Sequence, residues 1–223
     1  MFIVREEAPE ITRRIKRILM ERIEDKEPPN RIWLSDAVYC GRKKIFRIVR
    51  GDTEHFDERT LNRLWLGTIV EANLEALGVA SNIKVEYRTR SGNIVYGKID
   101  VISDTREPIE VKATSSIRTA KSLYAERHIE QLATYCVAVK SDTGILVYYV
   151  PDVKITSLPV YRYRFDIEQY KSIIDERIDI LYRALDYMEP MIAPPTWHSK
   201  TLDNWECKQC RYLQICAGNT TIT

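Results

Sequence analysis

The sequence lacks any apolar run of the length needed to cross a bilayer, which takes about 20 residues. Its first residues, Met1 to Glu7, also lack the basic and then apolar layout of a secretory signal peptide. These two absences argue against a membrane protein and against a secreted one. We therefore expect a cytoplasmic protein that has no membrane partner.

A strong net charge is missing as well. The 34 basic and 32 acidic residues leave a formal net charge of +2, so the molecule as a whole carries no basic signal for nucleic acid. The local distribution is less even, because a basic cluster directly follows Cys40: Arg42, Lys43, Lys44, Arg47 and Arg50. A solvated helix face is one interpretation of this basic cluster. A path for a DNA backbone is the other.

No internal repeat or low-complexity segment divides the 223 residues, which suit one domain with a small appendage. Ser35 and Asp36 resemble the cap of a short helix that carries Cys40. We expect an α/β core at 57–189, an N-terminal helical segment at 1–56 and a cysteine-rich segment at 190–223. Apolar periodicity predicts helices over 10–26, 57–77, 118–139 and 167–188, and strands over 83–88, 94–102, 109–113, 144–150 and 161–165.

Two carboxylates and a lysine on neighbouring predicted strands form the candidate catalytic site. Asp100 lies near the end of one strand, and Glu110 and Lys112 flank Val111 in the next. Glu110 and Lys112 point to the same face, which we expect to be solvated if Val111 faces the core. Converging carboxylates bind a hard cation, and the lysine can orient or deprotonate a water, as phosphodiester cleavage requires. Ordinary surface charge is the alternative.

The helix predicted after these strands adds polar side chains. Gln131 and Tyr135 are four residues apart and share one helix face. His128 lies three residues before Gln131 on that face. Tyr135 alone could be a core residue, but the pair indicates contacts to DNA or to Lys112.

Few of the five cysteines are expected in disulfides, because disulfides are rare in the cytoplasm. Cys207, Cys210 and Cys216 lie close together near the C-terminus, and Cys40 lies far upstream. Four thiolates suit either a zinc ion or an iron–sulfur cluster, and spacing does not decide between them. Cys136 is expected to be a buried structural thiol. His198 could replace one cysteine as a ligand.

These motifs resemble the RecB-type branch of the PD-(D/E)xK nucleases. The matching segments are Gly-Lys-Ile-Asp at 97–100, Ile-Glu-Val-Lys at 109–112 and Gln-Leu-Ala-Thr-Tyr at 131–135. The resemblance implies a restriction-endonuclease-like core with a central mixed sheet flanked by helices.

The same resemblance assigns roles to the matching residues. It implies that Asp100, Glu110 and the backbone carbonyl of Val111 bind Mg²⁺ or Mn²⁺. It further implies that Lys112 assists the attacking water. The remaining two motif residues would contact the substrate: Gln131 and Tyr135.

One position departs from that family, which usually has a metal-binding histidine four residues after a glycine. Here Gly67 is followed at that distance by Glu71. A carboxylate can be a hard-metal ligand, and replacing imidazole favours Mg²⁺ over Mn²⁺. Weakened activity is the alternative consequence. His55 is a candidate substitute ligand, although an exposed loop histidine is the simpler interpretation.

The cysteines and the segment 35–43 resemble the CRISPR-associated RecB-like nucleases, the fourth of the core Cas families, from about residue 32 to 216. This resemblance implies a 4Fe–4S cluster that joins the two ends of the chain through Cys40, Cys207, Cys210 and Cys216. It implies exonuclease activity on single-stranded DNA or single-stranded ends. It also implies spacer-precursor processing beside the Cas integrase complex. The alternatives are an inactive DNA-binding or assembly subunit, a redox sensor, and a repair or viral nuclease outside CRISPR.

Overall fold

The computed structural model describes residues 31–52, 64–70, 81–114, 124–150, 159–198, 202, 205–208 and 210–218. The helix expected at 10–26, the candidate ligand Glu71 and the candidate His55 lie outside the described residues. Of the helix expected at 57–77, residues 64–70 are described and are helical. Its expected apolar side chains Leu64, Trp65 and Ile69 each keep more than a third of their surface exposed.

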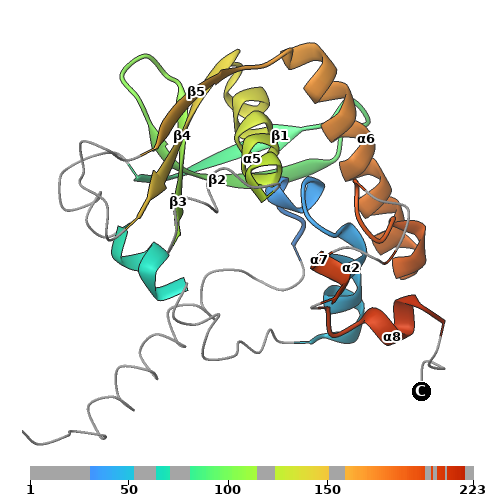
Figure 1. Ribbon diagram of the computed structural model, residues 1–223. Coiled ribbons are helices and arrows are strands. Elements are labelled where there is room, and N and C mark those ends of the chain that lie inside the picture. Colours follow the sequence, from blue (N-terminus) through green and yellow to red (C-terminus); the bar gives the residue numbers. More distant parts are fainter. Residues whose placement is uncertain are drawn as a thin grey trace, which may run out of the picture.

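A mixed five-stranded sheet forms the centre of the fold, with the strand order β1-β2-β3-β4-β5 (Figure 1). Neighbouring strands are antiparallel, apart from the parallel pair β3 and β4. The mixed sheet agrees with the predicted architecture, and the expected strand at 94–102 matches β2 at both ends. The strand bounds are Ser81–Arg88 (β1), Ile94–Ile102 (β2), Pro108–Ala113 (β3), Thr143–Tyr149 (β4) and Val160–Arg164 (β5).

Helix α5, Tyr124–Val139, follows β3 and leads into β4. A parallel pair of strands needs such a crossover, and Figure 1 shows α5 lying across the sheet. Gly144 in β4 permits a close approach, because a Cβ atom there would lie 2.7 Å from the Cys136 Sγ and 2.9 Å from Leu132. A side chain at this position would therefore push α5 away from the strand.

Helix α6, Ile167–Asp186, packs beside α5 and begins where Asp166 accepts a hydrogen bond from the backbone N–H of Gln169 at 3.0 Å. It also contacts the hairpin between β1 and β2, since the Tyr182 hydroxyl donates to the carbonyl of Ile94 at 2.5 Å. Its fully buried side chains, among them Ile178, belong to the main core. Thus α6 joins the edge of the sheet to α5.

The N-terminal part of the described chain contains the 3₁₀-helix η1, Leu34–Ala37, and helix α2, Gly41–Arg50. The expectation that Ser35 and Asp36 cap a helix carrying Cys40 is wrong. Both lie inside η1, because Asp36 turns back to accept from the backbone N–H of Trp33 at 2.7 Å. Cys40 is instead the N-cap of α2, where its sulfur accepts from the backbone N–H of Lys43 at 3.4 Å.

The basic cluster is divided between the interior and the surface. The Arg42 guanidinium is buried and donates to the carbonyl of Ala193 at 2.9 Å. The buried Lys44 ammonium lies 3.4 Å from Asp36. Two members are exposed, Lys43 and Arg50. The interpretation of the cluster as one solvated helix face is therefore wrong, because Arg42 and Lys44 are buried and make contacts within the fold. A path for a DNA backbone along this segment stays a prediction.

The C-terminal part returns to α2. It contains η3 (Pro190–Ile192), α7 (Trp205–Lys208) and α8 (Leu213–Cys216), and Figure 1 shows α7 and α8 beside α2. Tyr212 stacks on Phe46 with ring centroids 5.1 Å apart, and its hydroxyl donates to Asp52 at 2.8 Å. The two ends of the described chain therefore meet. Among the described helices, none is both long and apolar enough to span a membrane.

Candidate active site and cysteine centre

Strand β3 places Glu110 and Lys112 beneath α5. Glu110 is only 2% exposed, whereas Val111 is half-buried. The core therefore lies on the side of Glu110, and the solvated face that we expected for a core-facing Val111 is not found. The face is covered because Gln131 and Tyr135 of α5, both buried, lie over it. A buried carboxylate of this kind is costly unless it is paired. The burial of Glu110 therefore argues against ordinary surface charge.

Asp100 is attached to the same strand by its side chain. Backbone pairing between β2 and β3 joins Val101 to Ile109 and Ile102 to Pro108. At the next position the Asp100 carboxylate itself accepts from the backbone N–H of Val111 at 2.8 Å. This hydrogen bond holds the carboxylate against the backbone between Glu110 and Lys112. The three residues predicted to act together are thus brought together.

Lys112 is held between a carboxylate and an amide. Its ammonium forms an ion pair with Glu110 and donates to the Gln131 Oε1 at 3.0 Å. Burial alone would lower the pKa of Lys112, but the neighbouring Glu110, Tyr39 and Asp100 outweigh burial and raise that pKa above its ordinary value. Lys112 is therefore protonated at neutral pH. In this charged state its N–H groups can orient a water.

Gln131 is the centre of the polar contacts under α5. Its Oε1 accepts from both the Lys112 ammonium and the Tyr39 hydroxyl, each at 3.0 Å. Its Nε2 donates to the Tyr135 hydroxyl at 3.1 Å. Burial raises the pKa of Tyr39 and that of Tyr135, so both hydroxyls stay protonated at working pH. Tyr39 was not among the site residues predicted from the sequence. Its position directly before Cys40 is the sequence feature that could have indicated it.

Gly97 explains how Tyr135 comes so close to the sheet. A Cβ atom at position 97 would lie 3.3 Å from the Tyr135 ring and 3.0 Å from Val85. A glycine at this position therefore permits the close approach of the Tyr135 ring.

His128 occupies a neighbouring position without joining the hydrogen bonds of Gln131. Its Nδ1 lies 3.0 Å from the Tyr148 hydroxyl. Burial, helped by the positive charge of Lys112, lowers the pKa of His128 to about 3. His128 is therefore a neutral ring beside the candidate catalytic cluster, which consists of Asp100, Glu110, Lys112, Gln131 and Tyr135.

The donors available for a metal ion are oxygens. Asp100 and Glu110 supply carboxylates, and hard cations such as Mg²⁺ prefer such ligands. Within the described residues no three His, Cys, Asp or Glu side chains form a group able to hold a metal. The expected third side-chain ligand, Glu71, lies in the part of the chain that is not described. The chemistry of the two described carboxylates fits a divalent cation.

The four candidate cluster cysteines come from both ends of the described chain. Cys40 begins α2, Cys207 lies in α7, Cys216 ends α8 and Cys210 lies between these last two helices. Burial raises the pKa of Cys40 to about 12, and the nearby Cys210 and Cys207 add to the effect. Burial also raises the pKa of Cys216, again with a contribution from these two thiols. Cys40 and Cys216 each lie near Cys207 and Cys210. In the structure, however, no three of these described cysteines are grouped closely enough to hold a metal.

Two further residues singled out in the sequence lie apart from these thiols. Cys136 is fully buried in α5, 3.4 Å from the carbonyl of Thr143, as expected of a structural thiol. His198 Nε2 lies 2.6 Å from Glu130. The side chain of His198 therefore belongs to a polar network rather than to the cysteine centre.

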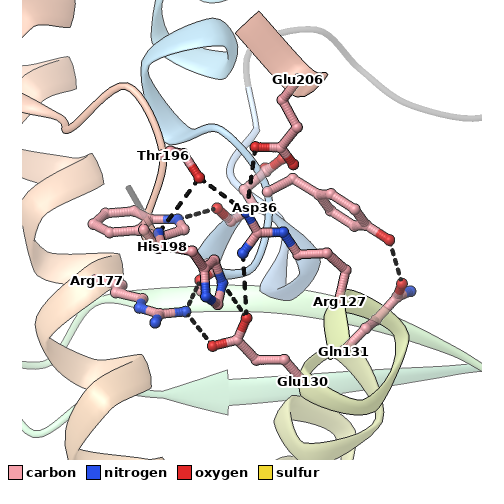
Figure 2. A network of polar contacts seen from close by, with 11 residues as sticks. Asp36, Arg127, Glu130, Gln131, Arg177, Thr196, His198 and Glu206 are labelled. Atoms are coloured by element: carbon pink, nitrogen blue, oxygen red, sulfur yellow. Dashed lines mark hydrogen bonds and ion pairs between the residues drawn. The ribbon is translucent and has the colours of Figure 1, made fainter. Parts of the chain in front are cut away.

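That polar network lies at one side of α5, on the turn from Arg127 to Gln131 (Figure 2). Glu130 pairs with Arg177 at 2.7 Å and lies 3.9 Å from Arg127. Arg127 also donates to Thr196 at 3.0 Å and lies 3.7 Å from Glu206. The network joins α5 to the segment leading to the C-terminal cysteines. Its residues showed no pattern in the sequence, because they come from four distant parts of the chain.

The chain matches a known nuclease family along most of its length. The sequence model of the PD-(D/E)XK nuclease superfamily matches residues 4–217. A protein described as the CRISPR-associated exonuclease Cas4, from Saccharolobus solfataricus, is 26% identical over 225 residues, which cover 93% of this chain and 97% of that protein.

Solved structures share the fold. The crystal structure of SSO0001 superposes with a TM-score of 0.59 at 22% identity and covers 97% of this chain and 98% of that one. An alkaline exonuclease (LHK-Exo) from Laribacter hongkongensis superposes with a TM-score of 0.52 at 14% identity. It covers 71% of this chain and 91% of its own. The sheet and its helices are thus those of known nuclease structures.

Proposed function

This chain belongs to the PD-(D/E)XK nuclease superfamily, and we propose that it is a metal-dependent DNA exonuclease that acts on single-stranded DNA or single-stranded ends. The observation that carries the proposal is the buried cluster under α5. There the Asp100 carboxylate is tied to Val111, and Lys112 is paired with Glu110. Two carboxylates and the Lys112 ammonium converge at this point, which suits hydrolysis of a phosphodiester.

The proposed metal is Mg²⁺ or Mn²⁺. Asp100 and Glu110, with the Val111 carbonyl and Glu71, would hold it, and when bound it would polarise the phosphate and lower the pKa of a water. The protonated Lys112 donates hydrogen bonds, so it orients the attacking water or stabilises charge on the phosphate.

The helix residues complete this proposed division of roles. Gln131 fixes the Lys112 ammonium by accepting one of its hydrogen bonds. Tyr135 fixes the amide of Gln131 by accepting from its Nε2. Both side chains therefore act as positioning groups. They keep the Lys112 ammonium directed at one point near the carboxylates of Asp100 and Glu110.

We further propose that the four cysteines hold a 4Fe–4S cluster. The support is that cysteines from both ends of the chain lie near one another, with Cys207 buried and the other three half-buried, and that this environment disfavours free thiolates at Cys40 and Cys216. A cluster would offset that cost and join the two ends. The likeness to a CRISPR-associated exonuclease supports a cytoplasmic role in processing spacer precursors with the Cas integrase complex.

The proposal is tested by cleavage of end-labelled single-stranded DNA with Mg²⁺ and with Mn²⁺. The wild-type protein should shorten linear strands from an end and leave circular strands intact. Glu110→Ala should abolish cleavage. Glu107→Ala is the matched control, because Glu107 is also buried and acidic but pairs with Arg162 outside the cluster, and it should keep cleaving.

Two outcomes would contradict the assignment. Full cleavage by Glu110→Ala would refute the proposed location of the active site. Tight binding of DNA by the wild-type protein with no cleavage in either metal would favour the alternative of a non-catalytic DNA-binding or assembly subunit.

A further inference from the structure

Both cysteine segments contact the turn of α5 that runs from Arg127 to Gln131. We propose that Tyr39 is a positioning residue that links the cysteine centre to the catalytic lysine. The inference rests on the proposed nuclease function and adds to it a route by which the cysteine centre acts on the active site.

The link runs through a single oxygen atom. The Gln131 Oε1 accepts from Tyr39 and from Lys112, each at 3.0 Å, although Tyr39 and Gln131 are 92 positions apart in the sequence. The amide cannot turn freely, because its Nε2 donates to Tyr135. Tyr39 therefore restrains the atom that receives the Lys112 ammonium. Loss of its hydroxyl would leave that oxygen with one donor and would loosen the lysine.

The position of Tyr39 is set by the segment that carries Cys40. Its backbone N–H donates to the carbonyl of Ser35 at 3.3 Å, and Cys40 follows as the N-cap of α2. Arg177 donates to the carbonyl of Ala37 at 2.8 Å and holds the preceding turn. A shift of Cys40 would therefore move the Tyr39 hydroxyl.

The C-terminal cysteines reach the same turn by a second contact. Glu206 directly precedes Cys207 and lies 3.7 Å from Arg127, which is four residues before Gln131 on α5. Figure 2 shows Glu206, Arg127 and Gln131 along this route. The residue before each of these two cysteines thus contacts α5. This convergence indicates that the centre is built to hold the catalytic helix in place as well as to close the chain.

The first test is Tyr39→Phe, which removes one hydroxyl and keeps the ring. We expect kcat to fall about three- to tenfold, as the loss of one hydrogen bond predicts. KM, the melting temperature and the iron content should stay unchanged. Tyr182→Phe is the matched control, because it also loses one hydroxyl hydrogen bond, to Ile94, outside the active site. It should cleave at the wild-type rate.

The second test asks whether Tyr39 acts through Gln131. If it does, the double variant Tyr39→Phe/Gln131→Leu should be no slower than Gln131→Leu alone. A merely structural tyrosine would give multiplied losses instead. The NMR signals of the Gln131 side-chain amide should also shift in Tyr39→Phe without DNA, which supplies a readout independent of cleavage.

Several results would overturn the inference. They are a wild-type kcat for Tyr39→Phe, multiplied losses in the double variant, a kcat loss matched by loss of iron, or unmoved Gln131 amide signals. Absence of cleavage by the wild-type protein would instead refute the proposed function. In that case the amide signals still decide whether Tyr39 restrains Gln131.

Discussion

The candidate catalytic cluster and the cysteine centre are held together in different ways. The side chains of the candidate cluster come from two neighbouring strands and the helix that follows them, and hydrogen bonds of 2.8 to 3.1 Å join them. The cysteines come from opposite ends of the chain, on short helices that meet through contacts such as Phe46 with Tyr212. The first site is organised by the sheet itself. The second depends on the packing of distant segments.

This difference bears on what each site needs from a bound group. The Glu110 carboxylate is already paired with Lys112 and buried, so the catalytic cluster is formed by protein contacts alone. Three of the cysteines are half-buried and Cys207 is buried, and the charges of neighbouring thiolates raise the pKa of Cys40 and of Cys210. A bound metal ion or cluster would coordinate the thiolates, so its binding free energy would offset their mutual repulsion. We therefore expect the cysteine centre to lose structure without its cofactor and the catalytic cluster to keep it.

The largest effect is expected for Lys112→Met on the catalytic side. Cleavage should fall at least about 100-fold, because a hydrogen-bond donor aimed at the reacting group is lost. The free energy of unfolding should fall by about 3 to 5 kcal/mol, because Glu110 would remain buried without its cation. Single-turnover cleavage and urea unfolding measure the two effects. In the double variant Glu110→Gln/Lys112→Met, stability should recover while activity stays lost. Equal instability of both variants would contradict this account of the pair.

On the cysteine side, Cys210→Ser should remove the bound iron and lower the melting temperature by about 5 to 10 °C. That shift corresponds to the stability lost when a ligand no longer binds, if its concentration is well above its dissociation constant. The far-ultraviolet circular dichroism of the sheet should change little, since the strands do not depend on the thiols. Iron analysis and thermal unfolding under anaerobic conditions test this. Stoichiometric zinc in a colourless wild-type protein would instead identify a structural zinc site.

A smaller effect is expected for His128, and it depends on pH. The pKa of His128 lies at about 3 in the folded protein, against its ordinary value of 6.5. Between these values the unfolded state binds a proton that the folded state does not, so stability falls as the pH falls through this window. From pH 7 to pH 5 His128 should lower the free energy of unfolding by about 2 kcal/mol.

Comparison of the wild-type protein with His128→Gln separates the contribution of His128 to the pH dependence of stability from that of the other titrating groups. Urea unfolding of both proteins in the presence of a chelator, at several pH values, gives the difference directly. A pH-independent difference between the two proteins would show that His128 titrates alike in the folded and unfolded states.

Cys136→Ala should have the smallest effect. Cys136 is a thiol in the core against β4, so its truncation should cost about 1 kcal/mol of stability. Iron content and cleavage should match those of the wild-type protein. Loss of iron in this variant would place Cys136 in the cysteine centre, against its position in the structure.

The sequence by itself determined the elements that carry the catalytic residues. Alternation along β2 and helical spacing along α5 are local patterns, and they placed Asp100 in a strand and Gln131 beside Tyr135. The tertiary structure decided the burial of Glu110, the place of Cys40 before α2, and the contacts of Tyr39 and Glu206 with α5. Periodicity reports how a segment divides between core and solvent. It does not report which distant segment covers it, because that choice depends on the packing of the whole chain.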